Sequence, residues 1–239
     1  MVIFSLKKNR CFFVIPVSLC EKKYAMKNIY IISGLGADER VFFKTDFGNN
    51  NVTHIHWVTP LQNESIEAYA LRLCTHIHHE NPILVGLSFG GMVAMEVAKH
   101  IATETIILIS SAKTKHELPK FYRIAGKLNL HKLIPPYFFK SANVFTNWAF
   151  SNRSKNDKRI LAEMMKDMDM IFLRWAIDKI LHWKNETIHK NVFHIHGTAD
   201  RILPYKNTND TITINGGPHL MIVTKAVEVN KHLQEILKS

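Results

Sequence analysis

The sequence predicts an α/β protein with a doubly wound, mainly parallel sheet of about six strands and a helical cap insertion. From residue 28 onward, short runs rich in β-branched residues alternate with longer segments of helical periodicity. Several of the short runs are apolar throughout, which is typical of strands covered by helices on both faces. One long interval interrupts this alternation and shows helical pattern alone. These three observations predict the fold class.

Six segments are predicted to be strands because each is short and rich in Val, Ile or Thr. They are Asn28–Ser33, Val52–Val58, Ile83–Leu87, Thr105–Ser110, Val192–His196 and Thr211–Ile214. The spacing of apolar residues predicts helices over 63–80, 90–101 and 224–238. Strands that alternate with helices form parallel pairs, because each crossover returns the chain to the same end of the sheet.

The interval from Ser111 to about Lys190 contains no predicted strand. Three prolines divide it, and residues 157–182 carry an apolar stripe at helical spacing. The stripe consists of Ile160, Met164, Met168, Ile171, Phe172 and Trp175. We expect one domain over 26–239, with about 111–190 inserted as a helical cap over the carboxyl edge of the sheet, where α/β proteins bind ligands.

The composition is that of a soluble globular protein: 46% of residues are hydrophobic and 21% are charged. The net charge is +11, and eleven Lys/Arg against two acidic residues lie between Lys113 and Arg159. This basic segment is either a solvated surface, which we favour, or a site that attracts an anionic substrate or a membrane surface. No nucleic-acid-binding motif accompanies the charge. We therefore expect neither nucleic acid nor a membrane as a partner.

Residues 1–25 form an N-terminal extension with three open interpretations. In the first interpretation, the natural protein starts at Met26 and residues 1–25 lie upstream of it. Alternatively, the basic flank before the apolar run Cys11–Leu19 resembles a signal that would export or lipid-anchor the protein through residues 1–20. In the third interpretation, 2–6 and 11–19 form a hairpin at a sheet edge. We expect the extension to be dispensable, because it contributes no catalytic group.

The three cysteines, Cys11, Cys20 and Cys74, are too few for a disulfide framework. No spaced Cys/His set indicates zinc. We therefore expect a reducing, cytoplasmic location.

The segment Ile83–Met92 combines an apolar strand, the motif Gly86-x-Ser88-x-Gly90 and the start of a helical pattern. This context is that of a nucleophile elbow, in which a sharp turn strains the serine backbone and lifts its hydroxyl above the sheet. Gly86 and Gly90 leave room for the chain to pass itself. The sequence therefore predicts Ser88 as a nucleophile.

A serine hydroxyl becomes a good nucleophile when a histidine removes its proton and a carboxylate orients that histidine. In this architecture the three residues follow in the order Ser, acid, His. Asp200 follows the strand 192–196, and His219 follows the strand 211–214. We therefore expect Ser88, Asp200 and His219 to form a catalytic triad.

Rival residues exist for both partners of the serine. His194 and His196 lie two apart within a strand, so we expect them to be packed or edge histidines. Asp38 lies beside the loop after the first strand, and Asp210 begins a strand. Neither is our preferred acid.

Acyl transfer also needs two backbone N–H groups that stabilise the developing oxyanion. We expect one from Phe89, directly after the nucleophile, and the other from Leu35 in the glycine-rich loop after the first strand. A dinucleotide-binding interpretation of this loop fails, because the third glycine of GxGxxG would fall at Glu39.

Together, Ser33-Gly-Leu-Gly36, the elbow, His196-Gly-Thr-Ala-Asp200 and Gly217-Pro-His219 resemble the α/β-hydrolase superfamily. The resemblance covers about residues 28–238 and departs at Ser33, where many members carry histidine. It implies the α/β-hydrolase fold and an esterase-like serine hydrolase that forms an acyl-enzyme on Ser88. The superfamily also contains thioesterases, lactonases, C–C hydrolases and non-catalytic binding proteins, so these alternatives stay open.

No cofactor or metal is expected. The histidines outside the triad lie at a predicted helix end or alternate along a strand. They include His54, His56, His76, His78 and His79.

The predicted cap is rich in aromatic residues, which indicates either core packing or a pocket for a small molecule with an apolar acyl or aryl group. These residues are Phe121, Tyr122, Tyr137, Phe138, Phe139, Phe145, Trp148 and Trp175. The oligomeric state does not follow from the sequence.

Overall fold

The structure, a computed structural model, describes residues 26–133 and 155–239. Its strands form one six-stranded sheet in the order β2-β1-β3-β4-β5-β6, and every neighbouring pair is parallel. The strands are β1 Asn28–Ile32, β2 Asn51–Ile55, β3 Ile83–Leu87, β4 Thr105–Ile109, β5 Val192–Gly197 and β6 Ile212–Ile214. The predicted doubly wound parallel sheet is confirmed.

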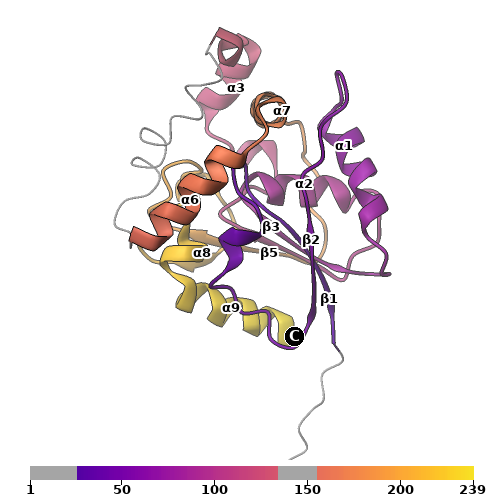
Figure 1. The fold of residues 1–239 in the computed structure, drawn as a ribbon, viewed down its shortest axis with the longest axis vertical. Helices are drawn as coiled ribbons and strands as arrows, with labels where there is room; N and C mark the ends of the chain where they lie inside the picture. Colours follow the sequence, from indigo (N-terminus) through magenta and orange to yellow (C-terminus); the bar gives the residue numbers. More distant parts are fainter. Residues whose placement is uncertain (1–25, 134–154) are drawn as a thin grey trace, which may run out of the picture.

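Helices cover both faces of this sheet (Figure 1). α1 and α2 lie on one face, and α8 and α9 lie on the other. The α-helices are α1 Ile66–Leu73, α2 Phe89–Val97, α3 Lys120–Lys127, α6 Lys155–Asp167, α7 Met170–Leu181, α8 Met221–Thr224 and α9 Ala226–Lys238. Short 3-10 helices are η1 Glu39–Phe42, η2 Cys74–His76, η3 Lys115–Glu117, η4 Leu130–Leu133 and η5 Tyr205–Asn207.

Alternate residues of the strands β1, β3 and β4 point into two separate apolar cores. Tyr30 and Leu84 pack with α1 and α2, whereas Ile31 and Val85 pack with α8 and α9. β3 is buried along its whole length, since both its faces are covered. This double burial explains why the strand is an uninterrupted apolar run.

Several predicted boundaries were wrong. The strand predicted to reach Val58 ends at Ile55, because the backbone of Val58 exchanges both of its hydrogen bonds with the Tyr69 hydroxyl instead of a strand. The helix predicted over 63–80 begins after its cap at Ser65 and ends at Leu73. The helix predicted over 90–101 is α2, which ends at Val97. The helix predicted over 224–238 is α9, which begins two residues later, at Ala226, after the short helix α8.

The apolar stripe predicted over 157–182 is interrupted. Asp169 caps the start of α7 by accepting a hydrogen bond from Ile171 N, so the helical phase restarts there. Ile171 is consequently 63% exposed, although the pattern predicted it to be buried. Met164 of α6 packs on the α8–α9 side and Phe172 of α7 on the α1–α2 side.

Two predictions fall on residues outside the described ranges. The alternatives for 1–25 lie there entirely, and the cap prediction over 111–190 includes 134–154. The described part of the insertion contains α3, α6 and α7, between β4 and β5. No helix within 26–133 or 155–239 is long and apolar enough to cross a bilayer.

A buried polar contact joins the end of the insertion to α2. Glu96 of α2 is 0% exposed, and its Oε1 accepts a hydrogen bond of 2.7 Å from Trp183 Nε1. Its other oxygen, Oε2, lies 2.7 Å from Lys99 Nζ. Because α2 begins directly after Ser88, this contact connects the insertion to the helix that carries the elbow.

We expect Trp183→Phe to lower the free energy of unfolding by about 1–3 kcal/mol, because it leaves a buried carboxylate oxygen without its donor. Urea denaturation measures this loss. Trp57→Phe is the matched control: Trp57 Nε1 is buried without a hydrogen-bond partner among the described residues, so only packing changes. Equal losses in both variants would contradict a specific role for the Trp183–Glu96 bond.

Candidate active site

Ser88 stands at the junction of β3 and α2 with φ 52° and ψ −120°. A positive φ is uncommon for a residue with a side chain and stores strain. Two hydrogen bonds with β4 and the residues after it hold the backbone there: Ser88 N donates to Ile109 O over 2.9 Å, and Ser111 Oγ donates to Ser88 O over 2.6 Å. The strained turn is therefore held by the neighbouring strand β4 and the residues that follow it.

The elbow glycines are required by close backbone contacts. A Cβ on Gly86 would lie 2.6 Å from Gly91 N, and one on Gly90 would lie 2.7 Å from the Ile32 carbonyl carbon. Both separations are shorter than real Cβ contacts. Glycine at these two positions therefore lets α2 start directly against β1 and β3.

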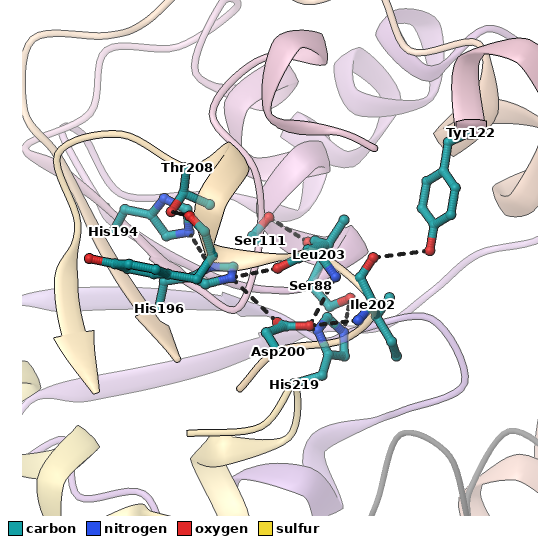
Figure 2. A network of polar contacts seen from close by, with 11 residues as sticks. Ser88, Ser111, Tyr122, His194, His196, Asp200, Ile202, Leu203, Thr208 and His219 are labelled. Carbon is teal, nitrogen blue, oxygen red and sulfur yellow. Dashed lines mark hydrogen bonds and ion pairs between the residues drawn. The ribbon is translucent and has the colours of Figure 1, made fainter. Parts of the chain in front are cut away.

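The structure brings Ser88, Asp200 and His219 together at the carboxyl ends of β3, β5 and β6 (Figure 2). Ser88 Oγ lies 2.9 Å from His219 Nε2, and His219 Nδ1 lies 2.7 Å from Asp200 Oδ2. Figure 2 shows the three side chains in a continuous chain of dashed contacts. This is the geometry that a nucleophile, a base and an orienting acid require.

The Asp200 carboxylate is buried, and both of its oxygens have hydrogen-bond partners. Its Oδ1 accepts hydrogen bonds from Ile202 N and Leu203 N over 2.8 and 2.9 Å. Burial by itself would raise the pKa of Asp200, but the charge and hydrogen bond of His219, with the Leu203 N–H, lower it below its ordinary value. The carboxyl is thus held in its ionised form at neutral pH.

His194 and His196 form a second buried chain behind this acid. His196 Nε2 lies 2.8 Å from Leu203 O and 3.5 Å from Asp200 Oδ2, and its Nδ1 lies 3.0 Å from His194 Nε2. The sequence analysis predicted packed histidines, and both are 1% exposed or less. It did not predict the contact with the acid, because His196 lies in β5 and Asp200 in the turn after it, where an i, i+4 spacing does not fix the distance between side chains as it does in a helix.

Burial lowers the pKa of both histidines, for His194 well below its ordinary value, with the neighbouring His196 and Lys113 adding to the effect. Both rings are therefore neutral at pH 7. When His196 Nε2–H donates to Leu203 O, its Nδ1 is an acceptor, and His194 Nε2–H must be the donor to it. The pair thus has one defined set of tautomers.

The loop after β1 lies directly against the nucleophile. A Cβ on Gly34 would be 3.3 Å from Ser88 Cβ. The loop is closed by a hydrogen bond from Ala37 N to Gly34 O over 3.1 Å and by one from Ser33 Oγ to Ala37 O over 2.8 Å. Ser33 stands where many α/β-hydrolases carry histidine, and here its hydroxyl closes the loop by this hydrogen bond.

The two predicted oxyanion donors remain predictions. Leu35 is the second residue of the turn closed by Ala37, and Phe89 is the first residue of α2. Neither N–H donates to another residue in the described part of the chain. Both are therefore free to donate to a substrate.

Neither of the rival acids, Asp38 and Asp210, contacts His219. Asp38 caps η1 and binds Arg40, with a distance of 2.9 Å between Arg40 Nε and Asp38 Oδ1. Asp210 is exposed and stands before β6, which begins at Ile212 rather than at Thr211 as predicted.

The remaining histidines are dispersed. His79 Nδ1 lies 2.7 Å from the Tyr30 hydroxyl, and His56 lies 3.5 Å from Glu39. Within the described ranges, no group of three His, Cys, Asp or Glu residues has the geometry to hold a metal ion.

Aromatic side chains lie beside the elbow. The Phe89 ring stacks on Trp57 with 5.6 Å between centroids and meets Trp175 edge-on at 6.1 Å. Of the cap aromatics, Trp175 and Tyr122 pack at this core, whereas Phe121 is 64% exposed. The remaining five lie outside the described residues.

The insertion between β4 and β5 also contacts the loop that carries Asp200. The Tyr122 hydroxyl of α3 donates to Ile202 O over 3.1 Å (Figure 2). Burial, together with the charge of Asp200, raises the pKa of Tyr122 to about 12, so the hydroxyl remains a donor at neutral pH.

No family model matches the sequence. No curated protein matches it either. Solved structures do match.

A hydrolase from Oleispira antarctica has a TM-score of 0.69 at 14% identity, over 90% of this chain and 92% of that chain. An esterase from Exiguobacterium antarcticum has a TM-score of 0.65 at 13% identity, over 90% and 93%. Est816, described as an N-acyl homoserine lactone degrading enzyme, has a TM-score of 0.63 at 18% identity, over 88% and 93%. With the six-stranded parallel sheet, these similarities show that the chain has the α/β-hydrolase fold.

Proposed function

We propose that this chain is a serine hydrolase that cleaves small ester-type substrates through an acyl-enzyme on Ser88. The observation that carries this proposal is the connected chain from Ser88 Oγ to His219 Nε2 at 2.9 Å and from His219 Nδ1 to Asp200 Oδ2 at 2.7 Å. Ser88 lies at a strained turn between a strand and a helix, and such a turn exposes the serine hydroxyl for attack.

In the first step, His219 Nε2 takes the proton of Ser88 Oγ while Oγ forms a bond to the ester carbonyl carbon. The carbonyl π electrons move to oxygen, and the N–H groups of Leu35 and Phe89 stabilise that oxyanion. When the oxyanion collapses, the ester C–O bond breaks and His219 gives its proton to the departing alkoxide. The products of this step are the alcohol and the Ser88 ester.

Water completes the cycle by the same route. His219 removes a proton from water, the hydroxide adds to the acyl carbon, and Ser88 Oγ leaves with the proton from His219. The products are the carboxylic acid and the free enzyme. Asp200 orients His219 and stabilises its protonated form, and every group in the cycle comes from this chain.

The buried histidine pair positions the acid in this proposal. His196 connects β5 to Leu203 O, and the N–H of Leu203 in turn donates to Asp200 Oδ1. His194 sets the tautomer of His196. Asp200 is thus held from both sides, by its own turn and by a neutral imidazole.

The substrate we propose carries an apolar acyl or aryl group, since the rings of Trp57 and Trp175 pack against Phe89 beside the nucleophile. A lactone is the second candidate, because a lactone-degrading enzyme is among the similar structures and lactone opening needs the same acyl transfer. Thioester or C–C bond cleavage on the same triad, and small-molecule binding without catalysis, remain the alternatives. We propose that the enzyme acts in the cytoplasm.

Ser88→Ala and His219→Ala are each expected to lower kcat for p-nitrophenyl esters by about a million-fold, because the triad acts as a unit. Stopped assays over several acyl lengths, with circular dichroism as the check on folding, measure this. His56→Ala, which alters an exposed histidine, is the control and should retain activity. Wild-type turnover by a folded Ser88→Ala variant would overturn the proposed function.

Asp200→Asn is expected to lower kcat by about ten-thousand-fold, because the amide favours the wrong tautomer of His219. Asp38→Asn is the matched control, since it changes the same atoms in a carboxylate that binds Arg40. If Asp38→Asn were the crippling change, the acid would be misassigned. The same ester assay decides.

His194→Gln is expected to flatten the pH dependence of stability. The native pKa of His194 is lowered, so the unfolded chain binds more protons below about pH 6.5 and stability falls as the pH decreases. Gln keeps an amide donor toward His196 but does not titrate. Between pH 7 and 5, where Asp200 is ionised, the slope should decrease by up to about 1.4 kcal/mol per pH unit.

Urea denaturation at several pH values measures the slope. The control is His56→Gln, at an exposed position. An unchanged slope in His194→Gln would contradict a lowered native pKa for His194.

A further inference from the structure

The segment formed by α3 and η4 exposes a cluster of apolar side chains. Phe121, Ile124 and Leu128 follow one another at helical spacing, and they are 64%, 57% and 63% exposed. Leu130 continues the cluster at 44% exposed. We call these four residues the α3 face.

The opposite side of the same segment packs against the protein. A Cβ on Gly126 would touch the backbone of Leu181 in α7, and the Tyr122 hydroxyl donates to Ile202 O. α3 therefore contacts the fold through Tyr122 and Gly126 and turns Phe121, Ile124 and Leu128 outward. It lies at the outer end of the molecule, above α7 in Figure 1.

Basic residues surround the α3 face, and no acidic residue occurs between Lys120 and Lys132. Lys120, Arg123, Lys127 and Lys132 make no ion pair with any residue in the described ranges. Lysines elsewhere often do: Lys115 pairs with Glu186, and Lys225 with Glu228. The cationic charge around this face is thus left for an external partner.

An apolar helical face bordered by uncompensated cations is the pattern of a segment that lies in a membrane interface. The apolar side chains enter the boundary between headgroups and acyl chains, and the cations contact anionic headgroups. Single exposed apolar residues occur on any soluble protein. Ile171 and Val227 are examples at 63% and 82% exposed, and neither belongs to a basic cluster of this kind.

We propose that the α3 face docks this protein on an anionic phospholipid surface. This reverses the expectation from the sequence that no membrane contact occurs, because the structure places the basic charge beside exposed apolar side chains. The binding does not depend on the proposed hydrolysis. It would, however, place the triad close to the lipid, since Ile202, the partner of Tyr122 in α3, follows Asp200 by two residues.

The test is co-sedimentation of the full chain with vesicles of phosphatidylcholine alone or with added phosphatidylserine. Binding is expected to the mixed vesicles, to be much weaker to phosphatidylcholine alone, and to decrease as salt is added. No binding, or equal binding to both vesicles at all salt concentrations, would overturn the proposal.

Two sets of substitutions separate the apolar and ionic contributions. The first set is the triple variant Phe121→Ser/Ile124→Ser/Leu128→Ser. It is expected to weaken vesicle binding by at least about tenfold. The second set is the triple variant Lys120→Gln/Lys127→Gln/Lys132→Gln. It is expected to weaken vesicle binding by about a hundredfold, since each cation near such a surface raises the affinity about fivefold. Hydrolysis of a soluble monomeric ester should stay at the wild-type rate in both.

Control variants carry two substitutions of the same kind elsewhere. Ile171→Ser/Val227→Ser and Lys231→Gln/Lys238→Gln alter exposed residues outside α3 and should bind vesicles as the wild type does. Equal losses in the controls would overturn the proposal by showing a nonspecific charge or surface effect.

Two other occupants of the α3 face would also be detected. If the serine variant abolished a wild-type dimer in sedimentation equilibrium while vesicle binding stayed unchanged, a second copy of the chain would be the partner. If it lowered Tm and left vesicle binding unchanged, residues 134–154 of the same chain would cover the face. Either result would contradict lipid docking.

Discussion

The strained turn at Ser88 is the constraint on which the rest of the site depends. A side chain at φ 52° is tolerated because glycines at 86 and 90 allow β1, β3 and α2 to meet closely, and because Ile109 and Ser111 hold the serine backbone. The strain is useful because it directs the hydroxyl away from the sheet. The loop after β1, which supplies a proposed oxyanion donor, is held against the same turn.

Several buried polar side chains gather at the end of the sheet where the triad lies. Asp200, His194 and His196 are nearly inaccessible, yet each is part of a continuous set of hydrogen bonds that reaches from β5 to Ser88. In such surroundings an unpaired group would be costly, so the network defines one arrangement of the acid loop. Stability and the proposed catalysis thus depend on the same hydrogen bonds.

The triad candidates could be predicted because chain order and strand ends are local features of the sequence. The predicted strands and the doubly wound sheet are recognisable for the same reason, since an apolar run flanked by helical patterns is a short-range signal. The prediction of one apolar stripe over 157–182 was wrong because Asp169 is the N-cap residue of a new helix, α7. The two helices α6 and α7 then bury side chains in different cores. Periodicity assumes one continuous helix, so it cannot reveal such a break.

The sequence by itself determined the parallel α/β architecture, the elbow at Ser88 and the order of Asp200 and His219 behind it. Only the tertiary structure decided that His196 lies against Asp200, that Glu96 receives the indole of Trp183, and that α3 turns Phe121, Ile124 and Leu128 outward. The physical reason is the range of the interactions. Strand, turn and helix signals depend on neighbouring residues, whereas burial, pKa values and exposed faces depend on which distant segments pack together.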